Sequence, residues 1–151
     1  MKGVFITGCL FCIAGLFAAC NSDVPVSATT DIVSSGFHVT VTRLATHPFL
    51  ARFNLKLTVS TTAGCTASSE LFPDTGGVSR RNLYLSDSGL LFLIGQFDVR
   101  RFDENSCRVD LIEFRALERK LAFLGSFDVD GANHWTFFPL SVREERSFEK
   151  L

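Results

Sequence analysis

The sequence predicts an all-β domain of about seven short antiparallel strands, arranged as a sandwich or a partly open barrel. Apolar and polar residues alternate with period two in several segments. Turn-forming residues separate these segments at intervals of roughly 8–12 residues, which is typical of such folds. One pair of cysteines is also placed to close a disulfide.

The alternation is clearest between Phe49 and Ser60. There, a first set of apolar residues alternates with a second set of polar or charged residues: Phe49, Ala51, Phe53, Leu55, Leu57 and Val59 against Arg52, Asn54, Lys56, Thr58 and Ser60. Residues 37–42 repeat the pattern. A strand places successive side chains on opposite faces of its sheet, whereas a helix would spread both sets around its circumference. Each segment is therefore predicted to be a strand with one buried face and one solvated face.

Further strands are expected later in the chain, separated by turn signals rich in Asp, Ser, Asn and Gly. They are predicted at residues 82–86, 90–100, 107–115, 120–129 and 134–142. Residues 61–81 contain several glycines and a proline. We interpret them as a long loop fastened at Cys65.

Residues 114–124 support two interpretations. Apolar residues at helical spacing and good helix formers favour a helix, whereas a hairpin tip at 116–119 would join two strands. Residues 92–99 recur in similar form at 122–129, with a glycine at the same place in each copy. This internal similarity favours two equivalent hairpins in one sheet, with Gly95 and Gly125 as bulges or bends.

The first residues have the pattern of an export signal. An apolar run follows Lys2 and is shorter than the roughly 20 residues that a transmembrane helix needs. The run ends in Leu16-Phe17-Ala18-Ala19-Cys20. This segment resembles the lipobox of bacterial lipoprotein precursors, which implies cleavage before Cys20 by lipoprotein signal peptidase and lipidation of that cysteine. An ordinary secretory signal cut after Ala19 is the alternative.

These patterns divide the chain into four regions. We expect a signal peptide over 1–19, a lipidated flexible tether over 20–35, a single β domain over 36–142 and a charged tail over 143–151. Asn21 replaces the Asp that resembles an inner-membrane retention signal. The predicted location is therefore the periplasmic face of the outer membrane, with the inner membrane and the cell surface as alternatives.

The cysteines sort by region. Cys9 and Cys12 belong to the predicted signal, and Cys20 is the lipidation site. Cys65 and Cys107 remain as one pair in an oxidising compartment, which predicts a disulfide. Closing a loop of about 40 residues is worth roughly 4 kcal/mol in the chain-entropy model. Two metal-ligating thiolates are the alternative, but neither cysteine lies in a Cys-x-x-Cys motif.

Candidate catalytic patterns are weak. His134 with Asp128 or Asp130 could contribute to a Ser-His-Asp arrangement, but the chain has no Gly-x-Ser-x-Gly motif. Asp130 lies in a predicted turn that favours Asp for its own backbone hydrogen bonds. Asp98 and Asp128 are interpreted as residues of solvated strand faces. We therefore predict no enzyme, catalytic residues, metal site or cofactor, and the net charge of −1 argues against nucleic acid as a partner.

Two segments are candidates for binding. Residues 135–140 are apolar on both faces, so they form either a central core strand or an open face that receives a partner. The loop at 61–81 combines arginines with an aromatic residue, a common interface composition, although it could equally have no partner. The predicted partner-binding residues are Trp135, Phe137, Phe72, Arg80 and Arg81.

The favoured function is a non-enzymatic protein-binding or assembly module, anchored to the membrane by its N-terminal lipid. Its partner would be an envelope protein such as a component of a secretion machine, a pilus or an outer-membrane protein. A protective or inhibitor lipoprotein, acting in toxin immunity, lysozyme inhibition or phage exclusion, is the alternative. A binder of lipid or another hydrophobic ligand is a third possibility, suggested by the 16 phenylalanines.

Overall fold

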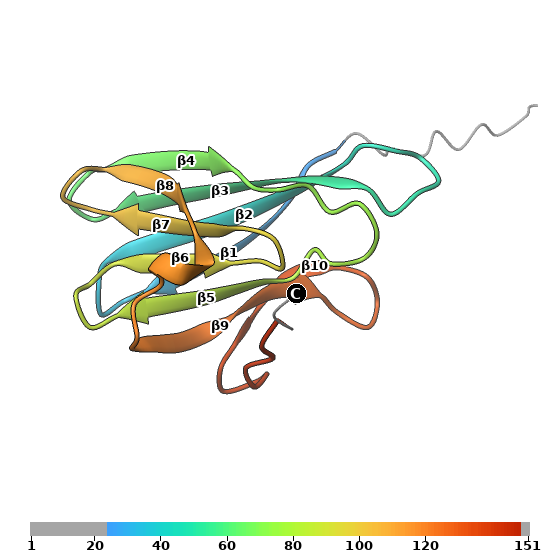
Figure 1. Ribbon diagram of the computed structural model, residues 1–151. Coiled ribbons are helices and arrows are strands. Elements are labelled where there is room, and N and C mark those ends of the chain that lie inside the picture. The colour runs from blue at the N-terminus through green and yellow to red at the C-terminus, as the bar shows by residue number, and fades with distance from the viewer. Residues whose placement is uncertain (1–23, 149–151) are drawn as a thin grey trace, which may run out of the picture.

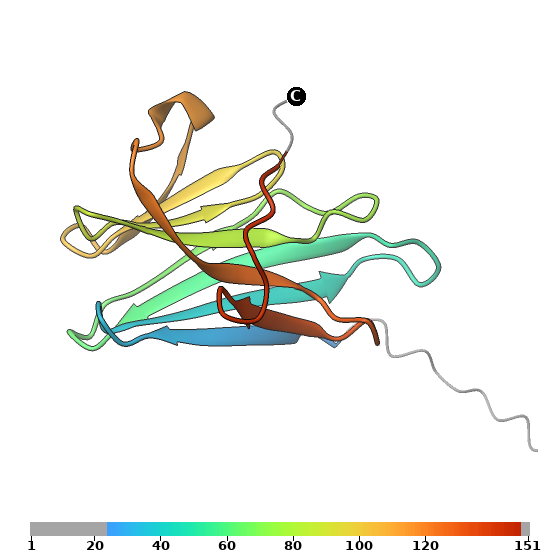
Figure 2. The same ribbon diagram turned by 90° about the horizontal axis from the view of Figure 1, so that it is seen from below.

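Two antiparallel sheets face each other across a shared core, as Figures 1 and 2 show for a computed structural model that describes residues 24–148. The predicted all-β class is confirmed, and the sheets form a sandwich that is not closed into a barrel. The described residues form ten strands rather than about seven. The predicted signal peptide and the lipidation site at Cys20 lie outside the described residues.

The first sheet has four strands in the order β1-β2-β3-β4, and the second has six in the order β10-β9-β5-β6-β7-β8. The strands of the first sheet are β1 (Val26–Ile32), β2 (Phe37–Ala45), β3 (Phe53–Thr61) and β4 (Thr66–Glu70). Those of the second are β5 (Arg81–Ser86), β6 (Leu91–Ile94), β7 (Val99–Asp103), β8 (Arg108–Ile112), β9 (Leu121–Val129) and β10 (Trp135–Pro139). A short 3-10 helix, η1 (Phe114–Ala116), precedes β9.

The four-stranded sheet has the alternation that the sequence predicts. Its apolar side chains face the core and its polar side chains face outward. The buried set on β2 and β3 is Phe37, Val39, Val41, Leu55, Leu57 and Val59. Polar residues such as Thr40 and Lys56 occupy the opposite face, so this sheet is buried on one side only.

The six-stranded sheet is buried on both faces. One face supplies residues such as Leu83 and Phe102 to the shared core. The other carries a second apolar cluster that includes Phe92 and Val99, and Leu117 and Phe148 pack against it. The described part of the charged tail, residues 143–148, therefore lies against the sheet at Phe148, while most of its residues stay exposed. Because β5 and β6 carry apolar residues on both faces, the second face must also be covered by other segments of the chain.

The predicted flexible tether over 20–35 is wrong from residue 26 onward, because β1 occupies Val26–Ile32. This strand pairs with β2 along its whole length, from Val26 opposite Arg43 to Ile32 opposite Phe37. Ala28 and Ile32 point into the core. The small polar residues between them fit a half-solvated edge strand as well as they fit a linker.

Two further boundaries differ from the prediction. The expected long loop over 61–81 contains β4, which pairs with β3. The expected single strand over 90–100 is interrupted by a tight turn between β6 and β7, where the N–H of Gly95 donates to the carbonyl of Asp98 at 2.8 Å. Apolar residues on both sides of that turn make it resemble one continuous strand in sequence.

The predicted pair of equivalent hairpins is also wrong. β8 lies at a sheet edge beside β7, whereas β9 pairs with β5 and β10, so residues 107–115 and 120–129 do not form a hairpin. The segment between these strands contains η1, a single 3-10 turn. The longer helix considered as an alternative for residues 114–124 does not form. Gly95 occupies a turn, while Gly125 lies within β9 at a register shift and has a φ of +152°. The similar segments thus have different structures.

The predicted disulfide between Cys65 and Cys107 is confirmed, with a Cα–Cα distance of 5.8 Å. Cys65 lies in the β3–β4 turn and Cys107 in the β7–β8 turn, so the bond joins the two sheets at one end. We call the opposite end the entry end: it is where β1 begins and where the β2–β3 loop projects (Figure 1). Within the described residues, no helix is long and apolar enough to cross a membrane.

Candidate functional site

A buried carboxylate organises the loops at the entry end. Asp98 lies between two arginines, with its carboxylate oxygens 3.7 Å from Nε of Arg81 and 3.5 Å from Nε of Arg100. All three residues are buried. These distances are charge contacts and not hydrogen bonds. The expectation that Asp98 lies on a solvated strand face is therefore wrong, because the two cations compensate its burial.

Arg81 ties the segment after β4 to this cluster. Its Nη1 donates to the carbonyls of Val78, Ser79 and Arg80, and its Nη2 donates to the carbonyl of Phe72 at 2.7 Å. Burial lowers the pKa of Arg81, and the nearby carboxylate of Asp98 opposes that shift. The guanidinium thus satisfies backbone acceptors along the whole segment.

Asp74 holds the middle of the same segment. One carboxylate oxygen accepts the N–H groups of Gly76, Gly77 and Val78, and the other accepts the hydroxyl of Ser79. Burial raises the pKa of Asp74, but the hydrogen bonds from Ser79 and the three N–H groups outweigh burial and leave the pKa lowered. The carboxylate therefore stays ionised and keeps this loop folded on itself.

Two exposed phenylalanines flank the buried carboxylate. The N–H of Phe72 donates to Oδ2 of Asp98 at 2.9 Å, and Phe97 is the residue before Asp98 in the chain. Their exposed fractions are 42% for Phe72 and 56% for Phe97. The guanidinium of Arg100 lies 5.7 Å from the centre of the Phe72 ring. We call Phe72 and Phe97, whose backbones both adjoin this charge cluster, the aromatic pair.

Close packing around Gly95 keeps this arrangement tight. A Cβ at Gly95 would lie 2.7 Å from both Nε of Arg81 and Oδ1 of Asp98. A larger residue would therefore push the ion pair apart. The glycine is required for space, and it brings the β6–β7 turn against the segment that carries Phe72.

The predicted binding residues of this loop differ in how exposed their side chains are. Phe72 is exposed, as a contact residue must be. Arg81 is buried, so its predicted role as a contact residue is wrong and it supports the loop instead. Arg80 is partly buried, with its guanidinium 4.5 Å from the centre of the Phe148 ring. Phe97 escaped prediction because it lay inside an apparent strand.

Trp135 and Phe137 belong mainly to the interior. The indole of Trp135 is buried and its Nε1 donates to the carbonyl of Val41, so its predicted role as a surface anchor is wrong. Phe137 is partly buried, with its ring centre 4.9 Å from that of Phe127. Of the two interpretations of residues 135–140, the core strand is the one observed for Trp135.

A polar cleft runs between the tail and the outer face of the six-stranded sheet. Its lining includes Arg80, Asp128, Arg143 and Arg146. Arg143 pairs with Asp128 at 2.8 Å, which accounts for the charge of Asp128. Burial lowers the pKa of Arg80, and the neighbouring cation of Arg146 lowers it further. Because charges of both signs line the cleft and compensate each other, it carries no clear chemical role.

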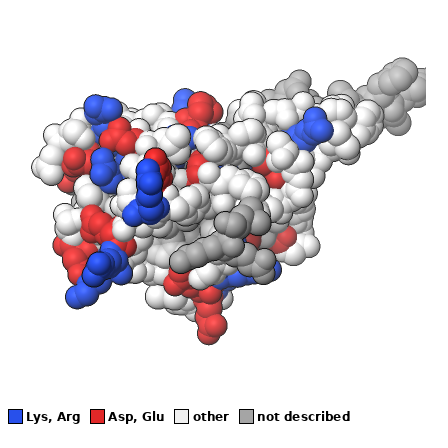
Figure 3. Space-filling view, in the orientation of Figure 1, with Lys and Arg blue, Asp and Glu red and all other residues white. Residues whose placement is uncertain are grey.

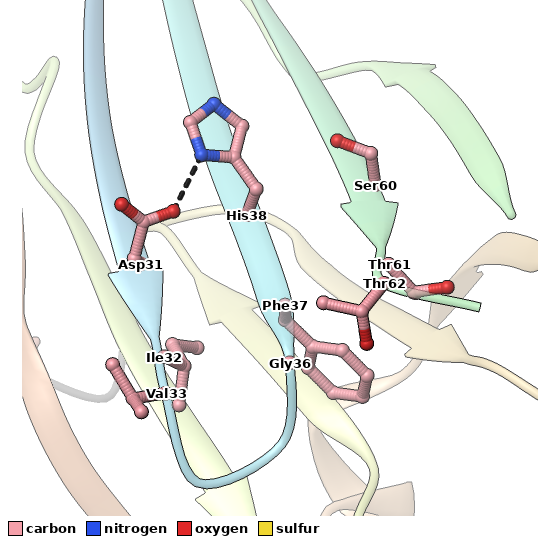
Figure 4. Close-up of a pocket in the computed structure, with 9 residues that line it drawn as sticks. All are labelled: Asp31, Ile32, Val33, Gly36, Phe37, His38, Ser60, Thr61 and Thr62. Atoms are coloured by element: carbon pink, nitrogen blue, oxygen red, sulfur yellow. Dashed lines mark hydrogen bonds and ion pairs between the residues drawn. The ribbon is translucent and has the colours of Figure 1, made fainter. Parts of the chain in front are cut away.

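A depression of about 450 Å³ beside the β1–β2 turn holds a serine, a histidine and an aspartate in one row (Figure 4). Asp31, His38 and Ser60 are cross-strand neighbours on β1, β2 and β3. Nδ1 of His38 lies 2.6 Å from Oδ1 of Asp31, but both side chains are largely solvated. Among the described residues, no hydrogen bond joins Ser60 to His38. Catalytic triads rely on a buried acid and a prearranged oxyanion site, which this row does not provide.

His134 and Asp130, which the sequence suggested as candidates, are engaged in the β9–β10 turn. Oδ1 of Asp130 accepts the N–H groups of Ala132 and His134 in the β9–β10 turn. This confirms the turn role predicted for Asp130. Within residues 24–148, no group of three or more His, Cys, Asp or Glu side chains is arranged to hold a metal ion.

Comparisons with known proteins identify no relative of this chain. No family model, no curated protein and no solved structure matches the chain. The observations that bear on function are therefore the sequence motif at Cys20 and the geometry of the entry end.

Proposed function

We propose that this chain is an outer-membrane lipoprotein, anchored through lipid on Cys20, whose sandwich is a non-enzymatic protein-binding module. Its contact surface is the aromatic pair at the entry end. The anchor rests on the resemblance of Leu16-Phe17-Ala18-Ala19-Cys20 to a lipobox. The partner is an envelope protein in or close to the same membrane.

The exposure of Phe72 and Phe97 beside a buried charge cluster is the observation that carries the binding role. A phenylalanine ring offers a large apolar contact and few rotamers, so it loses little conformational entropy when a partner covers it. The cluster of Arg81, Asp98 and Arg100 holds the two loops before any partner arrives. Such prearranged aromatic side chains are typical of binding hot spots.

The position of the aromatic pair favours a partner at the membrane. The aromatic pair lies at the entry end, where the described chain begins only a few residues after Cys20. A partner that contacts Phe72 must therefore reach the zone next to the bilayer. A membrane-embedded protein, or a machine component that crosses this zone, meets that requirement.

The binding role is tested by crosslinking the full-length lipoprotein in intact envelopes and identifying captured proteins by mass spectrometry. The double variant Phe72→Ala/Phe97→Ala is compared with Phe114→Ala, which removes a ring of similar exposure, 45%, from η1. We expect one dominant envelope protein to be captured by the wild type and by Phe114→Ala, and to be lost in the double variant.

Equal capture by all three proteins would overturn the assignment of the contact surface. A captured toxin or cell-wall hydrolase would instead favour a protective or inhibitory role. The anchor is tested separately by the intact mass of the purified protein and by Cys20→Ser. Acylated Cys20 at the new N-terminus supports the anchor, whereas an unmodified cysteine overturns it.

A further inference from the structure

We propose that the β2–β3 loop is a second membrane contact, and that Phe49 and Leu50 at its tip enter the bilayer surface beside the lipid anchor. This inference rests on the proposed lipidation of Cys20. The second contact would fix the orientation of the domain on the membrane, because two contacts at one end hold the sandwich with its entry end toward the bilayer. The proposed binding partner of this apolar tip is therefore a lipid bilayer.

The distance from the anchor to the domain is short because β1 begins at Val26. Three residues lie between Cys20 and Val24. An extended chain spans at most ~3.6 Å per residue, so Cys20 lies within about 14 Å of Val24. The lipid on Cys20 would thus keep the start of β1 close to the bilayer, with no long tether to hold the domain away.

The β2–β3 loop projects from that same end. Val26 pairs with Arg43 near the end of β2, and the loop follows β2 directly. Figures 1 and 2 show this loop reaching beyond the neighbouring connections at the entry end. Phe49 is 90% exposed at its tip, and Leu50 beside it is also exposed. A large apolar tip is costly in water and favourable in the acyl region of a membrane.

The backbone of the tip is prepared for a poorly hydrated environment. The N–H groups of Phe49 and Leu50 both donate to Nδ1 of His47, at 3.1 and 3.0 Å. Pro48 has no N–H to satisfy. An unsatisfied backbone donor is unfavourable in a bilayer, so this internal pairing removes a main obstacle to insertion.

The charge distribution agrees with this orientation. In Figure 3 most charged side chains of the visible face gather over its left part, away from the entry end, and few lie at the right. Arg52 is exposed at the base of the loop. A cationic residue behind an apolar tip can stay at the level of the lipid headgroups while the tip enters below it.

The test measures the depth of the loop in vesicles that carry the full lipidated protein. Phe49→Trp places an indole at the tip, and Val33→Trp places one at an equally exposed position, 91%, in the β1–β2 turn at the far end. Lipids brominated on their acyl chains, in phosphatidylethanolamine and phosphatidylglycerol vesicles, quench only indoles that reach the acyl region. The native Trp135 is buried, and its constant background emission is determined with the wild-type protein.

We expect brominated lipids to reduce the emission of Phe49→Trp and shift it to the blue, and to leave Val33→Trp at the level of the wild type. No quenching of Phe49→Trp, or equal quenching of both variants, would overturn the inference. The intact mass of the same samples separates the two proposals. Acylated protein without quenching overturns the loop contact alone, whereas protein without lipid on Cys20 overturns both.

Discussion

Nε1 of Trp135 donates a hydrogen bond to the carbonyl of Val41 at 2.8 Å, which joins β10 of one sheet to β2 of the other. The indole also stacks on Phe127, with ring centres 6.5 Å apart. The only tryptophan of the chain is thus a cross-sheet connection inside the core. The disulfide between Cys65 and Cys107 makes a covalent cross-sheet connection at the far end.

Trp135→Phe is expected to destabilise the protein by roughly 1–3 kcal/mol, because it removes the donor to a buried carbonyl while keeping an aromatic ring. Trp135→Ala should cost about 3–5 kcal/mol, since it also leaves a cavity. Urea unfolding followed by circular dichroism measures both values. A Trp135→Phe protein as stable as the wild type would mean that the hydrogen bond contributes nothing net.

Asp98→Asn is expected to destabilise the protein by roughly 3–5 kcal/mol, because it leaves Arg81 and Arg100 buried without their counter-charge. Asp110→Asn is the matched control. Asp110 pairs with Arg101 and Arg108 at the surface, where such pairs contribute less than about 1 kcal/mol. Similar losses in the two variants would contradict the central role given to Asp98.

Removing the disulfide by Cys65→Ala/Cys107→Ala should cost about 2–5 kcal/mol, chiefly because the unfolded chain gains freedom. The loop that it closes has a sequence separation of 42. The wild type under reducing conditions should unfold at the same urea concentration as the double variant. If reductant leaves the unfolding midpoint of the wild type unchanged, the disulfide is either absent or inaccessible to the reductant.

Tyr84 offers a direct optical test of the docked tail. Burial raises the pKa of its hydroxyl to about 12; the hydrogen bond from Asn82 opposes this rise, and the hydrogen bond to Glu145 together with its negative charge adds to it. The raised pKa contributes stability that is fully present below the unfolded value of 10.0 and is lost as the pH rises toward 12.

Because the chain has one tyrosine, absorbance of the phenolate follows this group alone. We expect a titration midpoint near 12 in the wild type, and a lower midpoint in Glu145→Gln, which removes a neighbouring negative charge. A wild-type midpoint at 10.0, the ordinary value, would mean that the tail leaves Tyr84 exposed in solution. Asp130 is a suitable site for a control substitution because it lies in a remote turn.

Part of the candidate site was accessible from sequence. Phe72 could be selected because it lies in a long predicted loop that combines an aromatic residue with arginines, a common interface composition. Phe97 could not, because the apolar residues on both sides of the β6–β7 turn hide the turn. Arg81 was selected for its charge, but the structure buries it, and no local pattern distinguishes a buried arginine from an exposed one.

The residue order by itself determined the all-β class, the inward and outward faces of β2 and β3, and the pairing of Cys65 with Cys107. Periodicity is a local property, and the two cysteines of the predicted β domain leave one pairing. Only the tertiary structure decided that residues 26–32 form an edge strand, that Trp135 points inward and that Asp98 is buried. Each of these outcomes depends on partners that the fold brings from elsewhere: β2 for the edge strand, the opposite sheet for Trp135, and Arg81 for Asp98. A side chain's burial is set by the groups that surround it in space, which its neighbours in the sequence do not specify.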